Sequence, residues 1–175
     1  RPTAESPEAY ADAFTVYEND VVSFSLDALI ANDQDDDGDS IRIIAFNEAT
    51  NGTLAVELST VLIDAPSELG QVQDAVWSAT LADGSELPDW MQLDGVTGQV
   101  TATVPLDTLG DFEINFIRTV GADVQSATSG QYFDGNSGVT LNYTPNGSYS
   151  GSDKFTYTLT DDQQGTDTGT VNLTV

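Results

Sequence analysis

A stretch of seven residues that begins at Asp33 contains five aspartates and is the part of the sequence best suited to bind a cation. Its D-x-D-x-D-G pattern is formed by Asp33, Asp35, Asp37 and Gly38. Carboxylates at alternate positions before a sharp turn can wrap a hard cation with oxygens, and Asp39 adds another oxygen. Many protein oxygens without a phosphate substrate favour Ca²⁺ over Mg²⁺. The alternative is a solvated acidic turn.

The acidic loop does not fit an EF-hand. That motif requires a glutamate six residues after the glycine, where this chain has Ile44. The residues that follow the loop also indicate a strand and not a helix. The sequence therefore predicts a calcium-binding loop outside a helix–loop–helix frame.

The chain is strongly acidic, since 29 aspartates and glutamates against 4 lysines and arginines give a net charge of −25 in 175 residues. Nucleic-acid binding requires a basic surface and is not expected, and anionic membrane surfaces are disfavoured for the same reason. Divalent cations are the natural counter-ions. The absence of cysteine and histidine removes disulfides, thiolate chemistry and the commonest general base.

The sequence carries no sign of catalysis or of membrane insertion. No apolar run approaches the ~18 residues that a transmembrane helix needs. There is no Ser-His pair, phosphate-binding loop or cofactor motif, and nothing singles out a glycosidase-like carboxylate pair among the many acids. We therefore expect no enzyme. The start at Arg1, without methionine or signal peptide, suggests a piece of a longer protein.

Alternation of apolar and polar residues predicts β-strands toward both ends of the chain. Segments such as "VVSFSL", "GVTLNYT", "KFTYTLT" and "TVNLTV" place an apolar residue at every second position. Separated by Gly, Asn and Asp turns, they are typical of an antiparallel β-sandwich. The expected strands are residues 14–16, 21–26, 41–46, 52–57, 138–145, 154–160 and 169–175. Segment 41–46 is apolar on both faces, which indicates a central strand.

About 80 residues separate the fourth and fifth of these strands, far more than an ordinary sandwich loop. We therefore expect an all-β sandwich over residues 12–58 and 138–175, split in sequence by an inserted β-rich module at 59–137. Residues 1–11 would link it to a preceding module. Within the insertion, "AVWSATL", "GQVTATV" and "DFEINFIRT" indicate strands. The two short helical candidates are residues 6–14 and 65–77.

Sandwich topology predicts where the other carboxylates lie. Loops that connect alternate strand pairs gather at one end of a seven-stranded sandwich, together with the N-terminus. Asp161 and Asp162, in the turn "TDDQQGTD", and Asp12 would therefore join the acidic loop. The opposite end would receive Glu18, Asp20 and Asp153, and ordinary turn chemistry is an equally good explanation of those three residues.

The segments "ALIANDQDDDGDSIRI", "NGTL" and "LNYTPNGSYSGSDKFTYTLTDDQQGTDTGTVNLTV" occur in this order. They resemble the cadherin-like and Ig-like tandem repeats of very large bacterial surface adhesins, including the RTX-type adhesins exported by type I secretion. The resemblance covers about residues 8–58 and 138–175 and implies an extracellular sandwich stiffened by calcium. The ligands it implies are Asp33, Asp35, Asp37, Asp39 and Asp161, with Glu18 facing the next module. Simple spacer repeats lack the long insertion.

The insertion contains "LPDWMQLDGVTG", which resembles the LP-x-W-x-x-D-x-x-TG signature of dystroglycan-type cadherin-like modules. The matching residues are Leu87, Pro88, Trp90, Leu93, Asp94, Thr97 and Gly98. The acidic first half of such a module is missing, so the resemblance implies no separate cation site here. We expect a hairpin turn at residues 94–98 and a core position for Trp90.

These observations predict a non-catalytic, extracellular, calcium-binding module of a bacterial adhesin that acts as a rigid spacer in cell adhesion and biofilms. Its partners would be neighbouring modules of the same polypeptide. The alternative is a ligand-binding module whose insertion contacts a glycan or peptide. Candidate contacts are Trp77, Tyr132, Phe133 and Asp134, although a small core is the favoured explanation of these aromatic residues.

Overall fold

The structure is a computed structural model that describes residues 4–175. Positions 1–3 of the expected linker 1–11 lie outside the described residues. The chain forms two compact units: unit 1 comprises the segment up to Leu58 together with Gly135–Val175, and unit 2 is Ser59–Asp134. Unit 2 thus lies within the expected insertion, and each unit is described separately below.

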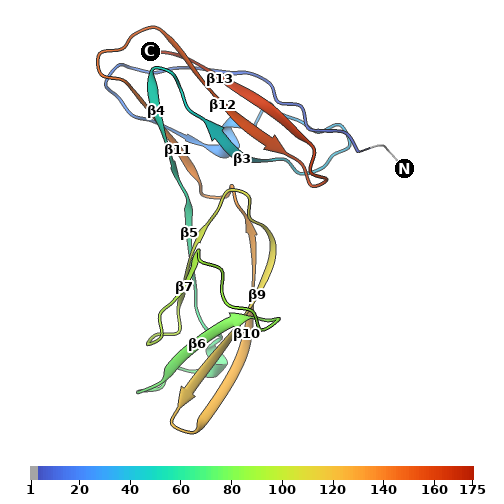
Figure 1. Cartoon of the computed structure of the whole chain (residues 1–175), viewed down its shortest axis with the longest axis vertical. Helices are drawn as coiled ribbons and strands as arrows, with labels where there is room; N and C mark the ends of the chain where they lie inside the picture. The colour runs from blue at the N-terminus through green and yellow to red at the C-terminus, as the bar shows by residue number, and fades with distance from the viewer. Residues whose placement is uncertain (1–3) are drawn as a thin grey trace. The chain divides into compact units, whose positions relative to one another are not determined.

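Unit 1 contains two β-sheets and one turn of α-helix (Figure 1). Its elements are β1 (Asp12–Thr15), β2 (Val22–Ser25), α1 (Leu26–Leu29), β3 (Arg42–Asn47), β4 (Gly52–Glu57), β11 (Thr140–Pro145), β12 (Ser152–Thr160) and β13 (Thr166–Thr174). One sheet has the strand order β1-β13-β12-β3 and the other β2-β11-β4. The pairing of β1 with β13 is parallel, and the other pairings of unit 1 are antiparallel.

The alternating pattern decides which side chains form the core of unit 1. In β12, Phe155, Tyr157 and Leu159 are buried, whereas the threonines between them are partly exposed. The two sheets meet at Phe155 and Phe24, whose ring centroids are 6.2 Å apart. Each expected strand of unit 1 is present, so the prediction of an all-β, antiparallel β-sandwich is confirmed.

Two buried tyrosines of unit 1 each cover a glycine on a neighbouring strand. Tyr157 covers its cross-strand partner Gly169, and Tyr143 covers Gly52. A Cβ atom added at either glycine would collide with the tyrosine ring. The hydroxyl groups donate hydrogen bonds to aspartates, Tyr157 to Asp33 (2.6 Å) and Tyr143 to Asp153 (2.8 Å). Both rings are therefore fixed at the glycine and at the hydroxyl.

Unit 2 also consists of two sheets, with strand orders β10-β9-β6 and β5-β8-β7. Its elements are β5 (Ser59–Ile63), the 3-10 turn η1 (Ser67–Leu69), β6 (Val76–Leu81), β7 (Met91–Leu93), β8 (Val100–Val104), β9 (Leu109–Val120) and β10 (Asp123–Asp134). Trp90, Phe112 and Phe133 meet edge to face with centroids 5.4 Å apart. As predicted, residues 94–98 form the turn of the β7–β8 hairpin, and Trp90 packs against the core.

The two helical candidates are wrong. Within residues 6–14, Glu8 forms an isolated bridge with Gln34, and residues from Asp12 onward form β1. Within residues 65–77 only η1 is helical, and β6 begins at Val76. Pairing with distant strands outweighs the local helical pattern at both places. In the described part of the chain α1, with four residues, is the longest α-helix, and none could cross a membrane.

Strand β3 is an edge strand and not the expected central one, because it pairs only with β12. The side chain of Asn136 completes its free edge. Asn136 Oδ1 accepts a hydrogen bond from Ile43 N–H (2.7 Å), and Asn136 Nδ2 donates one to the Ile43 carbonyl (2.8 Å). A buried amide therefore replaces a neighbouring strand, which explains how an apolar strand can end the sheet.

Candidate metal centre

The acidic loop between α1 and β3 gathers three carboxylates. Asp35, Asp37 and Asp39 each place one carboxylate oxygen within 4.8 Å of those of the other two. Asp35 Oδ1 shapes the turn by accepting hydrogen bonds from the N–H groups of Asp37 (3.1 Å) and Asp39 (3.2 Å). Gly38 has a φ of +84°, which residues with a Cβ atom rarely adopt. The sequence pattern thus builds a tight turn that brings three carboxylate oxygens close together.

The β12–β13 turn brings Asp161 to the same end of unit 1. Asp161 is 1% exposed, and its Oδ1 accepts hydrogen bonds from the N–H groups of Gln163 (2.8 Å) and Gly165 (2.7 Å). Gln163 Nε2 donates to Asp39 Oδ2 at 2.6 Å and to Asp37 Oδ2 at 3.4 Å. Gln163 therefore joins the two loops, a role that its uncharged side chain does not reveal in the sequence.

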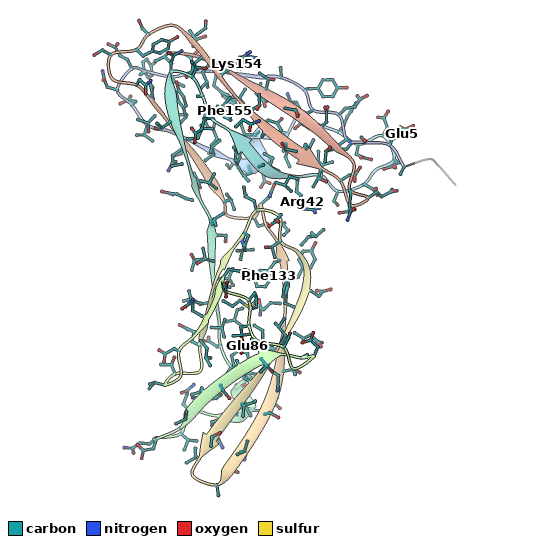
Figure 2. All side chains as sticks on the ribbon, in the orientation of Figure 1. Glu5, Arg42, Glu86, Phe133, Lys154 and Phe155 are labelled. Carbon is teal, nitrogen blue, oxygen red and sulfur yellow. The ribbon has the colours of Figure 1, made fainter. Side chains whose placement is uncertain are left out.

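Residues 4–11 close over these loops through backbone hydrogen bonds to aspartates. The pairs are Glu5 N–H to Asp37 Oδ2 (3.2 Å), Ala9 N–H to Asp167 Oδ2 (2.9 Å) and Tyr10 N–H to Asp33 Oδ1 (2.7 Å). Glu8 and Gln34 exchange two backbone hydrogen bonds of 2.8 and 3.1 Å. Figure 2 shows Glu5 at this end of unit 1. We call residues 4–11 the N-terminal strap.

Asp12 and Asp33 form a second carboxylate pair beside Tyr157. Asp33 accepts hydrogen bonds at both oxygens, from Tyr10 N–H and from the Tyr157 hydroxyl. Burial and the negative charge of Asp33 raise the pKa of Asp12 to about 6. Burial and the hydrogen bond to Asp33 raise the pKa of Tyr157, so its hydroxyl remains a donor. This pair is anchored to the core through Tyr157, unlike Asp35, Asp37 and Asp39.

Four carboxylate oxygens at this end of unit 1 are buried and accept no hydrogen bond from any described residue. They are Asp12 Oδ2, Asp35 Oδ2, Asp37 Oδ1 and Asp161 Oδ2. A buried charge without a partner is costly unless a proton or a cation neutralises it. Calcium binds oxygens at about 2.3–2.6 Å, which places opposite ligands about 4.6–5.2 Å apart. The carboxylates of the acidic loop therefore fit a calcium ion.

The central carboxylates of the loop differ in proton affinity. The interaction between their neighbouring carboxyl groups raises the pKa of Asp35 and lowers the pKa of Asp37. The hydrogen bond from the Glu5 N–H lowers the pKa of Asp37 further. A divalent cation bound beside both carboxylates would remove the repulsion between their charges.

Without calcium, the chain is expected to become more stable as the pH falls from 7 to 5. The folded-state pKa of Asp12, about 6, exceeds its ordinary value of 3.8, so folding takes up a proton between these values. Stability therefore falls as the pH rises through this window. Thermal melts in EDTA at several pH values measure the effect, and Asp12→Asn should reduce it. An unchanged pH profile in Asp12→Asn would contradict the assignment.

Glu18 does not join these ligands. It is exposed and follows Val16, whose N–H donates to the Thr174 carbonyl at the other end of unit 1. Asp153 lies near the same end as Thr174, away from the acidic loop, and its carboxylate accepts three hydrogen bonds. The donors are the Tyr143 hydroxyl (2.8 Å), Asn51 N–H (3.1 Å) and its neighbour Lys154 N–H (2.9 Å). Turn and core hydrogen bonding therefore accounts for Asp153.

The four predicted ligand contacts in unit 2 are divided between its core and its surface. Trp77 and Phe133 are each 4% exposed and belong to the core, into which Figure 2 shows Phe133 pointing. Their prediction as surface contacts is corrected, because strands β6 and β10 direct these alternate side chains inward. Tyr132 is 63% exposed, and Asp134 is partly exposed at the end of β10.

Residues 90–174 match the family model of the bacterial Ig domain. No curated protein matches the chain. Among solved structures, one titled endo-fucoidan hydrolase MfFcnA9 from glycoside hydrolase family 107 is similar at a TM-score of 0.24 with 11% identity. That comparison covers 99% of this chain but 35% of the other, so the chain spans about a third of its length. A TM-score this low carries no argument about fold or function.

The family match begins at Trp90 in unit 2 and ends within β13 in unit 1. Bacterial Ig domains are typical of extracellular and surface proteins. The match agrees with the paired antiparallel sheets described above. The fold is therefore an Ig-like, antiparallel β-sandwich, and residues 90–174 are similar to the bacterial Ig domain.

Proposed function

We propose that this chain is a non-catalytic, calcium-binding module of a bacterial surface adhesin, in which it acts as an extracellular spacer between neighbouring modules. The single observation that carries the proposal is the group of four buried carboxylate oxygens without hydrogen-bond partners among the described residues. Three of their four residues, Asp35, Asp37 and Asp161, lie in the acidic loop and the β12–β13 turn. Asp39 adds a fourth carboxylate.

The charge balance of the site favours a cation over any other partner. Within the described part of unit 1, Arg42 is the one cation recorded near this end, and its contact with Asp162 is 3.8 Å long. Such a contact is too weak to balance four or more carboxylates. A Ca²⁺ ion supplies two charges and takes six to eight oxygens, more than the loop alone offers. Water and backbone carbonyls would complete its shell.

Calcium at this site would hold the N-terminal strap in place where the chain enters unit 1. The N-terminal strap is attached to Asp33, Asp37 and Asp167, which lie in or beside the site. The C-terminus lies at the other end of unit 1, where Val175 and Gly151 exchange backbone hydrogen bonds (Figure 1). A module entered at one end and left at the other suits a string of modules, and an ordered entry stiffens the joint.

Terbium luminescence tests the proposal, with calcium competition and calorimetry to measure affinity. We expect saturable binding with a dissociation constant of about 10⁻⁴ M or weaker, as in extracellular modules. Asp37→Asn and Asp161→Asn should each weaken it about tenfold or more, because each removes a ligand charge. Glu57→Gln is the matched control, since Glu57 is exposed on β4 and outside the acidic loop. Failure to bind calcium at about 10 mM would refute the proposal.

A further inference from the structure

Strand β10 is the long open edge of unit 2. It has twelve residues and pairs with β9 on one side only (Figure 1). Between its terminal residues, no residue of β10 forms a backbone hydrogen bond to any described residue outside β9. In an antiparallel strand, every second residue directs its N–H and C=O groups away from the paired neighbour. About five residues therefore present unpaired backbone groups along this edge.

The sequence of β10 lacks the features that normally protect an open edge. Between Asp123 and Asp134 it reads VQSATSGQYF, without a charge or a proline, although charged residues make up 19% of the chain. Natural edges are usually short or carry charged residues, prolines or bulges. The register of β10 on β9 is continuous, so a bulge does not protect it either.

Every other edge strand in the described chain has at most six residues, half the length of β10, and some of these edges are covered. In the same sheet, the outer side of β6 bonds to the carbonyls of Gly95 (2.9 Å) and Ser85 (2.9 Å). In unit 1, Asn136 completes the edge of β3. The edge strands β1 and β2 have four residues each. The long open edge is therefore specific to β10 and is not shared by the other edge strands.

An acidic hollow lies beside this edge on the exposed face of the sheet. It has a volume of about 610 Å³, and its lining includes Asp83, Asp111, Glu113 and Gly130. Gly130 on β10 is the cross-strand partner of Glu113 on β9. A Cβ atom added at Gly130 would meet no atom within 4 Å. A long side chain from outside the sheet can therefore cross Gly130 and reach Glu113.

We propose that β10 binds an extended segment of a partner protein by β-strand addition, and that a lysine or arginine of this segment crosses Gly130 to the acidic hollow. Backbone hydrogen bonds supply affinity that does not depend on sequence, and the hollow selects a basic side chain. Neighbouring strands are about 4.8 Å apart, so the partner residue opposite Gly130 lies about 9.6 Å from the Glu113 strand. Lysine and glutamate side chains together span this distance.

Charge favours a basic partner segment over a second copy of this chain. Antiparallel pairing of β10 with β10 of a second copy would bring Asp123 of one copy opposite Asp134 of the other at both ends. It would also join two chains that each carry a net charge of −25. Like charges opposed across strands destabilise a sheet. A segment with a central lysine instead meets Asp111 and Glu113.

The test uses the whole chain, labelled with ¹⁵N, and the blocked peptide SVTVKVTVS. We expect amide shifts and slower hydrogen exchange along residues 124–133, in EDTA as well as in calcium, because unit 2 does not contain the cation ligands. Replacing the peptide lysine by glutamate should weaken binding about tenfold or more. Asp111→Asn with Glu113→Gln should remove this preference, since both side chains are exposed and bury no core group.

Two N-methylated peptides separate strand addition from simple charge attraction. Methyl groups on alternate backbone nitrogens block one edge of the peptide, and the two versions block opposite edges. One version should retain binding and the other should lose it. Equal binding by both versions, or no shift in residues 124–133 with any peptide at about 1 mM, would overturn the proposal. A dimer in solution whose interface maps to β10 would also overturn it, in favour of self-association.

Discussion

Removing calcium is expected to lower the melting temperature of this chain by about 5–11 °C for each ion lost. At a calcium concentration a hundredfold above the dissociation constant, one site stabilises the folded state by about 2.7 kcal/mol. For a chain of this size, each kcal/mol corresponds to about 2–4 °C. The proposed dissociation constant near 10⁻⁴ M places this condition at about 10 mM calcium. Melts in EDTA and in calcium measure the difference directly.

The expected calcium-dependent rise in melting temperature comes from the acidic loop and not from the general negative charge of the chain. In EDTA the carboxylates of Asp35, Asp37 and Asp39 stay within 4.8 Å of one another without a counter-charge. Calcium removes that repulsion, whereas screening by salt acts on all exposed acids. Magnesium demands stricter octahedral geometry and dehydrates reluctantly, so we expect a smaller shift at equal concentration.

Two variants separate the site from the rest of the surface. Asp37→Asn should lose most of the calcium-dependent shift, because it removes a ligand charge at the centre of the loop. Glu57→Gln removes the same charge from an exposed position on β4 and should keep the shift. A melting temperature that calcium leaves unchanged in the parent chain would contradict calcium binding. An equal shift in Asp37→Asn would place the ion elsewhere.

The strands of unit 1 could be predicted from the sequence because one face of each is buried. Alternation in β12 and β13 directly encodes which residues face the core. In unit 2, β10 was not predicted, because its residues on both faces are mostly small and polar and only Phe133 is fully buried. The pattern that identifies a half-buried strand is absent there, and only pairing with β9 defines the strand.

In the candidate site, too, the contacts between residues close in sequence could be predicted, whereas those between distant residues could not. The acidic loop is local, so its spacing alone predicts the grouping of Asp35, Asp37 and Asp39. Gln163 and the N-terminal strap reach the loop from far along the chain, and no residue pattern records those contacts. Trp77 and Phe133 could not be placed, because a strand face becomes core only when the opposing sheet is known.

Gly169→Ala is expected to destabilise unit 1 by about 3 kcal/mol, although it adds one methyl group. The new Cβ would collide with the ring of Tyr157, which is completely buried. The ring cannot shift freely, because its hydroxyl donates to Asp33 Oδ2 and lies 3.1 Å from the Leu29 carbonyl. Overpacking costs about 1–3 kcal/mol, and a buried hydrogen bond left unmade adds about 1–3 kcal/mol. Urea unfolding measures the loss.

Gly130→Ala is the matched control. Gly130 also lies in a strand, its φ lies outside the left-handed region, and an added Cβ would meet no atom within 4 Å. Its replacement should leave stability within about 0.5 kcal/mol or raise it slightly, because alanine restricts the unfolded chain. If Gly169→Ala were equally mild, the ring of Tyr157 would not be held against Gly169.

A double variant assigns the loss to the ring itself. In a Tyr157→Leu background the obstacle is smaller, so adding Gly169→Ala should cost much less than it does in the parent chain. The same displacement of Tyr157 also removes the hydrogen-bond donor to Asp33, the first aspartate of the acidic loop. Gly169→Ala should therefore weaken calcium binding as well as stability. Gly52→Ala, which displaces Tyr143 at the opposite end, should reduce stability while leaving calcium affinity unchanged.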